Sequence, residues 1–225
     1  NAGGIVKPDK KFLETVVAMF RKQGVLIVLD EIFCGFHRTG PLFGFEHYSF
    51  EPDIVILSKA LTNGIVPLSC VWARDPLMLP KNFPPGTHSA TYVNNTLALA
   101  VADTSLERFA QWKDKGGALK KLERHLLKIV KNIQQHSPLV QSSYAIGGLA
   151  RLLLAKKIAG EIDDMAMTIA RDHPIEGFHG LILASTSLAP NVIAINPSLT
   201  ITEKELNIFE KLLLQTFVKA DRVVA

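Results

Sequence analysis

The sequence contains few cysteines, no long apolar run and no dense run of charge of one sign. Its two cysteines, Cys34 and Cys70, are too few for a disulfide framework or a four-cysteine metal site, and they favour a reducing, cytoplasmic compartment. No apolar stretch reaches the roughly 18 residues that a membrane-spanning helix needs. The seven histidines lack the spacing of metal ligands. Because the net charge of +4 is spread along the chain, we expect neither a nucleic-acid nor a membrane partner.

Two short apolar runs that end at charged residues predict strands. Residues 25–29 are five consecutive apolar residues followed by Asp30, and residues 53–57 lead into Ser58 and Lys59. A continuous apolar run is typical of a strand buried on both faces of a parallel sheet. Apolar periodicity predicts helices over residues 12–23, 96–111, 118–135, 163–172 and 203–218, and further strands within 66–73, 149–155 and 180–184.

The order of these elements predicts an α/β fold with a parallel or mixed sheet. After about Ser137 the character of the sequence changes, and shorter strands alternate with helices. We therefore predict two parts: residues 1–136 belong to a large domain, and residues 137–225 form a small C-terminal α+β domain. Thr202 is the expected N-cap of the last helix.

Asp30 and Lys59 each follow a predicted strand, at the end where ligands collect in open α/β sheets. Burial would lower the pKa of such a lysine and make its amine nucleophilic. A lysine and an acid are also the pair that pyridoxal 5'-phosphate (PLP) requires, the acid keeping the pyridine nitrogen protonated. Each residue alone also has a structural explanation, the aspartate as a turn or cap and the lysine as an exposed side chain. Their spacing by itself does not select PLP chemistry.

The residues around this pair resemble two motifs of the class III aminotransferases. Residues 30–40 (DEIFCGFHRTG) resemble the family's D-E-x-x-x-G-F-x-R-T-G signature, and residues 53–64 (DIVILSKALTNG) resemble its lysine segment. Residues 88–95 and 191–202 resemble two less specific segments, so the resemblance covers essentially the whole chain. It implies the fold type I of PLP-dependent transferases, with a mainly parallel sheet in the large domain and a small C-terminal α+β domain.

The resemblance implies a role for each matching position. Asp30 would pair with the pyridine nitrogen of PLP, and Lys59 would hold the cofactor as a Schiff base and move protons during transamination. Thr91 would donate its hydroxyl to the cofactor phosphate across the interface of a homodimer with shared active sites. Phe33 stands where many members place a polar residue near the phenolic oxygen of the cofactor, and is the fourth expected cofactor-binding residue. Glu31 would be structural and would fix the turn after the strand.

Two departures from the family leave the function open. Many members that act on α-amino acids have an arginine where this chain has Ala194, so either the substrate carboxylate is held from elsewhere, with Arg151 as a candidate, or the donor is an ω-amine. We expect transfer of an amino group from an amino acid or ω-amine to a 2-oxo acid such as pyruvate or 2-oxoglutarate. Racemases, epimerases and lyases use the same acid and lysine.

The family's first half, with its phosphate-binding loop, has no counterpart here, so an inactive fragment that serves as an assembly or partner domain is the other alternative.

Overall fold

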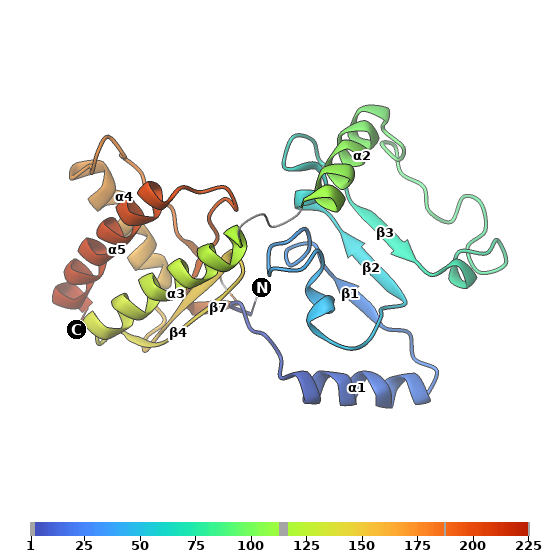
Figure 1. Cartoon of the computed structure of the whole chain (residues 1–225), viewed down its shortest axis with the longest axis horizontal. Coiled ribbons are helices and arrows are strands. Elements are labelled where there is room, and N and C mark those ends of the chain that lie inside the picture. The colour runs from blue at the N-terminus through green and yellow to red at the C-terminus, as the bar shows by residue number, and fades with distance from the viewer. Residues whose placement is uncertain (1–2, 113–116, 187, 225) are drawn as a thin grey trace. The chain divides into compact units, whose positions relative to one another are not determined.

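The computed structural model describes residues 3–112, 117–186 and 188–224. The chain divides into two compact units, each with its own sheet (Figure 1). The first unit is Lys7–Lys113, and the second unit is Asp114–Ala225 together with Asn1–Val6. Among the described residues, none of the helices combines the length and the apolar character needed to cross a membrane.

The first unit contains a three-stranded mixed sheet in the order β1-β2-β3. Strand β1 is parallel to β2, and β3 is antiparallel to β2, as predicted for a parallel or mixed sheet. Its elements are α1 (Lys10–Lys22), β1 (Val28–Asp30), β2 (Ile54–Leu57), β3 (Cys70–Ala73) and α2 (Thr96–Gln111), with 3₁₀ helices at Gly44–His47, Lys59–Thr62 and Asp75–Leu77.

Local capping signals explain why the two helices of this unit begin where they do. The Asp9 side chain accepts a hydrogen bond from the Phe12 amide at 2.8 Å, and Asn95 accepts one from Ala98 at 3.0 Å. Both bonds satisfy amides that have no partner within the first helical turn. After α1, Gly24 takes the left-handed backbone conformation that ends many helices.

Strand β1 differs from the expectation that residues 25–29 are buried on both faces. Regular pairing begins only at Val28, and the side chains of Val25, Leu26 and Val28 are exposed. That expectation is wrong for the described part of the chain, in which β1 pairs with β2 alone and these side chains are left uncovered. The continuous apolar run therefore predicted the strand correctly, but not the exposure of its side chains.

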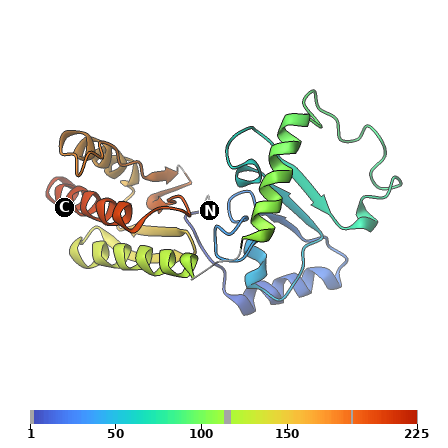
Figure 2. The same cartoon turned by 45° about the horizontal axis from the view of Figure 1, so that its top comes forward.

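The second unit contains an antiparallel four-stranded sheet in the order β4-β5-β7-β6. Helices α3, α4 and α5 pack together as a layer, with α3 on β4 and β5, and α4 on β6 and β7 (Figures 1 and 2). The core between helices and sheet includes the fully buried Ile129, Leu152 and Ile193. The elements are α3 (Ala118–His136), β4 (Val140–Ile146), β5 (Leu149–Leu154), α4 (Ala159–Asp172), β6 (Ala184–Thr186), β7 (Ala189–Ile195) and α5 (Glu203–Val224).

Helix α3 belongs to the second unit, whereas the sequence placed the boundary after it, between residues 136 and 137. Its apolar stripe, with Leu126 and Ile133 fully buried, packs against β4 and β5. The second unit thus begins one helix before Ser137, where the sequence starts to alternate shorter strands with helices.

The predicted N-cap of α5 is confirmed: Thr202 Oγ1 accepts from the Glu205 amide at 3.2 Å, and the Glu205 carboxylate accepts from the Thr202 amide at 2.7 Å.

Candidate active site

Asp30 and Lys59 lie at the same edge of the sheet in the first unit. Asp30 is the last residue of β1 and is in register with Ile56 of β2. Lys59 follows β2 after Leu57 and Ser58. Because β1 and β2 are parallel, their carboxyl ends meet at one edge, the usual place of ligands in α/β sheets. The structure therefore brings the predicted acid and amine to one edge.

The backbone at Lys59 is held in an unusual conformation. Its φ of +48° lies in the left-handed region, which residues other than glycine rarely adopt. Three hydrogen bonds fix the surrounding turn, from Ser58 Oγ to the Leu68 carbonyl, from Thr62 Oγ1 to the Val66 carbonyl, and from the side-chain Nδ2 of Asn63 to Ser105 Oγ. Such strain persists only where neighbours enforce it, and it clusters at functional sites.

The Lys59 side chain extends toward an aromatic ring. Its Nζ lies 5.2 Å from the centroid of the Phe33 ring, within the range of a cation–π contact. The two residues that the sequence assigned to the cofactor from different motifs are therefore neighbours. Lys59 is nevertheless exposed, so the expectation of a buried, desolvated lysine is wrong for this chain. The lysine extends from a short 3₁₀ helix at the sheet edge, where burial of the amine would require further covering segments.

Asp30 combines a structural bond with an available oxygen. Its Oδ1 accepts a hydrogen bond from the Ile32 amide at 2.9 Å, which is the turn role that a strand-terminal aspartate often has. Within the described part of the chain, its carboxylate forms no other hydrogen bond or ion pair, and the side chain is exposed. Oδ2 therefore remains able to accept from a ligand N–H.

Glu31 anchors the loop that carries Asp30 and Phe33. Its side chain is only 3% exposed, and its two oxygens accept from the amides of Gly44 and Phe45, each at 2.9 Å. Burial raises the pKa of this carboxyl, while the two backbone hydrogen bonds act in the opposite direction. The predicted structural role of Glu31 is confirmed, but its partners lie thirteen residues or more away, and no motif pointed to them.

Gly44 has no side chain, and this allows the loop to pack closely against it. A side chain at Gly44 would place its Cβ 3.1 Å from Cys34 Cβ and 3.3 Å from the Glu31 carboxylate oxygens. The half-buried Cys34 lies in the same loop, and burial, followed by the negative charge of Glu31, raises the pKa of its thiol. A thiol in these surroundings stays protonated and packs as a small apolar group.

Thr91 is not joined to the other three predicted residues. It is exposed in the segment between β3 and α2, four residues before the N-cap Asn95. In the ranges that the structure describes, it forms no hydrogen bond with Asp30, Phe33 or Lys59. Its assignment to the cofactor phosphate remains a prediction.

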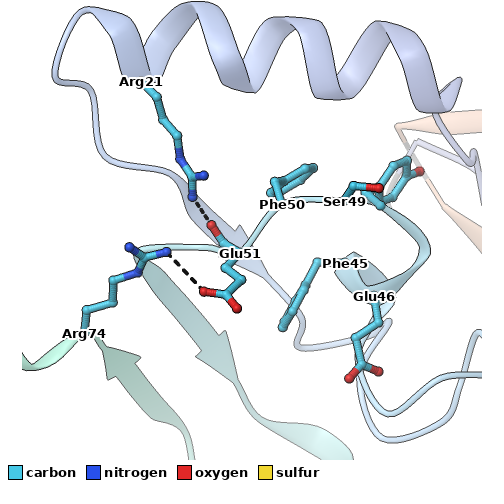
Figure 3. A pocket seen from close by; sticks show the side chains of 8 residues that line it. Arg21, Phe45, Glu46, Ser49, Phe50, Glu51 and Arg74 are labelled. Carbon is cyan, nitrogen blue, oxygen red and sulfur yellow. Dashed lines mark hydrogen bonds and ion pairs between the residues drawn. The ribbon is translucent and has the colours of Figure 1, made fainter.

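A separate hollow of about 590 Å³ lies on another part of the first unit (Figure 3). Two arginines converge on Glu51: Arg21 donates to its carbonyl, and Arg74 forms an ion pair with its carboxylate at 3.6 Å. Neither Asp30 nor Lys59 lines this hollow. Because Arg74 is paired with Glu51 and Arg21 is engaged by a backbone carbonyl, we do not assign a ligand to it.

The groups at the sheet edge fit PLP. The free oxygen of Asp30 can accept from a protonated pyridine nitrogen, the exposed amine of Lys59 can form a covalent bond to an aldehyde, and Phe33 offers an apolar surface beside that amine. The phosphate has a less complete set of partners, with Thr91 as the proposed hydroxyl donor.

Known proteins resemble this chain over nearly its whole length. The family model for class III aminotransferases matches residues 1–217. An ornithine aminotransferase of Schizosaccharomyces pombe is 32% identical over 208 residues, which are 90% of this chain and 44% of that protein. An acetylornithine aminotransferase of Gloeobacter violaceus is 31% identical over 218 residues, covering 91% of this chain and 47% of the relative.

Solved structures of ornithine aminotransferases are also similar to this chain. The ornithine aminotransferase of Plasmodium yoelii superimposes with a TM-score of 0.82 at 28% identity, covering 98% of this chain and 55% of that one. The ornithine δ-aminotransferase of Plasmodium falciparum gives a TM-score of 0.82 at 27% identity, over 99% and 54% of the two chains. The chain thus spans about half the length of the relatives that it matches.

Proposed function

This chain belongs to the class III aminotransferases, a family of PLP-dependent enzymes, and from that premise we propose that it carries the lysine and the acid of an aminotransferase. The reaction moves an amino group from an amino acid or ω-amine to a 2-oxo acid. One observation carries the proposal: Asp30 and Lys59 end at the same edge of two parallel strands, and Phe33 lies beside the lysine amine.

The chain's own residues would divide the chemistry among them. When bound, PLP withdraws electrons from the substrate carbon that loses its proton. Asp30 would accept a hydrogen bond from the pyridine nitrogen and would keep that nitrogen protonated. Lys59 would hold the cofactor through its amine until the amino substrate displaces it, and the freed amine would then carry the proton from the substrate carbon to the cofactor carbon. The strained turn at Lys59 fixes the position of the backbone from which the side chain with this amine extends.

Replacing Lys59 by alanine should abolish covalent capture of the cofactor. The purified chain is incubated with PLP and treated with borohydride, and the labelled residue is identified by peptide mass spectrometry. We expect label on Lys59 in the wild-type chain, at least a tenfold loss of total label in Lys59→Ala, and no change in the control Lys81→Ala, which removes another exposed lysine of the same unit. Equal labelling of the three proteins would contradict the proposal.

We also propose that the active form is a homodimer, in which Thr91 serves the partner's cofactor phosphate. Exposed apolar side chains of the first unit support association. Val71 and Trp72 are adjacent in β3 and both are about half exposed, at 54% and 50%, and adjacent strand residues face opposite sides of a sheet. Both faces of this strand therefore present apolar area that another polypeptide could cover.

Replacing Trp72 by arginine should reduce association without unfolding the chain. Because Trp72 is half exposed, we expect a stability change within about 1 kcal/mol. Sedimentation velocity over a concentration series should show a dimer for the wild type and a monomer for Trp72→Arg. Gln135→Arg, an exposed change on α3, is the control and should remain dimeric. A monomeric wild-type chain would contradict the homodimer.

The main alternative is an inactive chain that serves as an assembly domain, and the same exposed apolar side chains favour it. Association without labelling of Lys59 would select this alternative.

Racemases, epimerases and lyases share the acid and the lysine with aminotransferases. They are separated from transamination by testing whether amino groups appear on an added 2-oxo acid. A cytoplasmic location is proposed from the two cysteines, which are both free.

A further inference from the structure

His37 lies in the loop after β1, between carbonyl oxygens of two different segments. Its Nδ1 is 3.1 Å from the carbonyl oxygen of Gly40 in the same loop, and its Nε2 is 3.3 Å from that of Phe109 in α2. The side chain is half-buried, and the ring of Trp112 stands nearly perpendicular to it, with the centroids 4.8 Å apart. The class III signature leaves this position variable, so the family resemblance gives His37 no role.

Satisfying both contacts requires a proton on each nitrogen of the ring. A carbonyl oxygen can only accept, so a ring nitrogen must carry a proton to form its hydrogen bond. The neutral imidazole has one N–H and turns the lone pair of its other nitrogen toward a carbonyl oxygen, whereas the imidazolium donates from both nitrogens. Because the contact with Gly40 is the shorter one, we expect the neutral ring to keep its proton on Nδ1 and to lose the bond to Phe109.

The charges near His37 act in both directions. The rings that contact it, those of Phe109 and Trp112, are uncharged, and within the described residues it forms no ion pair. The buried carboxylate of Glu31 is held by two backbone amides, and the nearest cations along the two segments are Arg38 in the loop and Arg108 in α2. The two arginines oppose a charge on the ring. The last turn of α2, to which the Phe109 carbonyl belongs, favours a positive charge through the helix dipole.

Helix α2 holds both segments that carry the candidate active site. Ser105 accepts a hydrogen bond from Asn63, which ends the 3₁₀ turn of the lysine. One helical turn later, the Phe109 carbonyl meets the His37 ring of the loop that carries the acid. The bond between His37 and Phe109 therefore ties the acid-bearing loop to the helix that also anchors the lysine turn.

We propose that His37 is a positioning residue for the acid-bearing loop, and that its imidazolium form locks residues 31–44 to α2 by donating to both carbonyls. Its relevance to catalysis rests on the function proposed for Asp30 and Lys59. The locking is fully present at low pH, where the ring is charged, and is lost as the pH rises through the range of about 5 to 8 in which histidines change charge. Above that range, a lone pair on Nε2 faces the Phe109 carbonyl and the loop is released from α2.

Hydrogen exchange of peptides from residues 31–44 measures this locking without any cofactor. Rates are compared at about pH 5.5 and about pH 8, after correction for the intrinsic chemical rate. We expect protection of the wild-type loop to be about tenfold greater at the lower pH, the size of one hydrogen bond from a charged donor. Peptides of the second unit are the internal reference and should change little. Because PLP is absent, failure to label Lys59 would contradict the proposed function and leave this result standing.

Two variants show whether the pH dependence belongs to His37. His37→Asn keeps a neutral donor and suits the left-handed backbone, with φ of +64°, at this position, so its loop should be equally protected at both pH values. His88→Asn, which changes an exposed histidine of the same unit, should behave as the wild type does. Equal protection of the wild-type loop at the two pH values, or the same pH dependence in His37→Asn, would overturn the proposal.

The ring itself gives a second reading that needs no variant. In ¹H–¹⁵N spectra of the wild-type chain, both nitrogens of His37 should carry protons at the lower pH, and Nδ1 alone at the higher pH. A ring with its proton on Nε2 alone at the higher pH would keep the bond to Phe109, and would equally overturn the proposal.

Discussion

Replacing Phe36 by alanine is expected to remove about 3–5 kcal/mol from the stability of the first unit, the cost of deleting a fully buried phenylalanine. Phe36 is 2% exposed, and its ring lies 5.0 Å from that of Phe109 and 5.8 Å from that of Phe43. It joins the loop after β1 to α2 and to the buried side chains of β2. Since a domain is typically stable by only about 5–15 kcal/mol, this loss should leave the unit marginal.

Hydrogen exchange measured on peptides from residues 7–112 tests this expectation directly. In Phe36→Ala, the amides of β2 and α2 should exchange at least a hundredfold faster than in the wild type. Phe12→Ala is the matched control, because the same atoms are deleted from a side chain that is 64% exposed, and it should change exchange little. Similar effects of the two substitutions would show that the aromatic cluster does not stabilise the unit.

The same substitution should weaken the candidate site from a distance. Phe36 lies in the loop that also carries Asp30 and Phe33, and it packs on Leu61 in the 3₁₀ helix that begins with Lys59. If the loop loosens, the acid, the ring and the amine are no longer held at one edge of the sheet. Borohydride trapping of PLP on Lys59 should therefore decrease in Phe36→Ala and persist in Phe12→Ala.

The sequence predicted best what local signals determine. Helix α2 was placed at residues 96–111, where it is observed, because Asn95 caps it and its apolar residues recur at the helical period. The start of β2 was placed one residue early, and its end was correct. The acid and the lysine could be found because each stands at the end of a short apolar run and inside a motif of the family, so that their positions depend on short segments of chain.

What the sequence could not supply depends on contacts between distant segments. Strand β4 was missed because its Ser142 and Ser143 interrupt the apolar pattern, and pairing with β5 defines it. The contact between Phe33 and Lys59 and the anchoring of Glu31 by Gly44 likewise join separate segments. The exposure of Lys59 was mispredicted because a strand's apolar character does not reveal whether anything covers its end.

Replacing Glu31 by glutamine should cost about 1–3 kcal/mol, the usual penalty when a buried backbone donor loses its acceptor. The carboxylate accepts from two amides with two oxygens, Gly44 at one and Phe45 at the other. A glutamine has one carbonyl oxygen, and its NH₂ group would face the second amide. One amide at the start of the 3₁₀ helix Gly44–His47, beside the buried Glu31 side chain, would then lose its acceptor.

The cost of Glu31→Gln should also depend on pH, with a sign set by burial. Burial raises the pKa of Glu31 in the folded chain, so the folded state holds this proton more tightly than the unfolded state does. The contribution of Glu31 is therefore fully present below the unfolded pKa of about 4.3, and decreases as the pH rises through the folded pKa. The difference in stability between wild type and Glu31→Gln should shrink over the same range.

Urea unfolding at a series of pH values from about 4 to 8 measures this difference. Glu46→Gln is the matched control, because Glu46 also accepts a backbone hydrogen bond, from Phe43 at 3.0 Å, but is exposed. We expect a cost below about 1 kcal/mol for that control at every pH, since water can replace the lost acceptor. A cost of Glu31→Gln that grows as the pH rises would mean that the two backbone bonds outweigh burial, and that Glu31 stabilises the loop as a carboxylate.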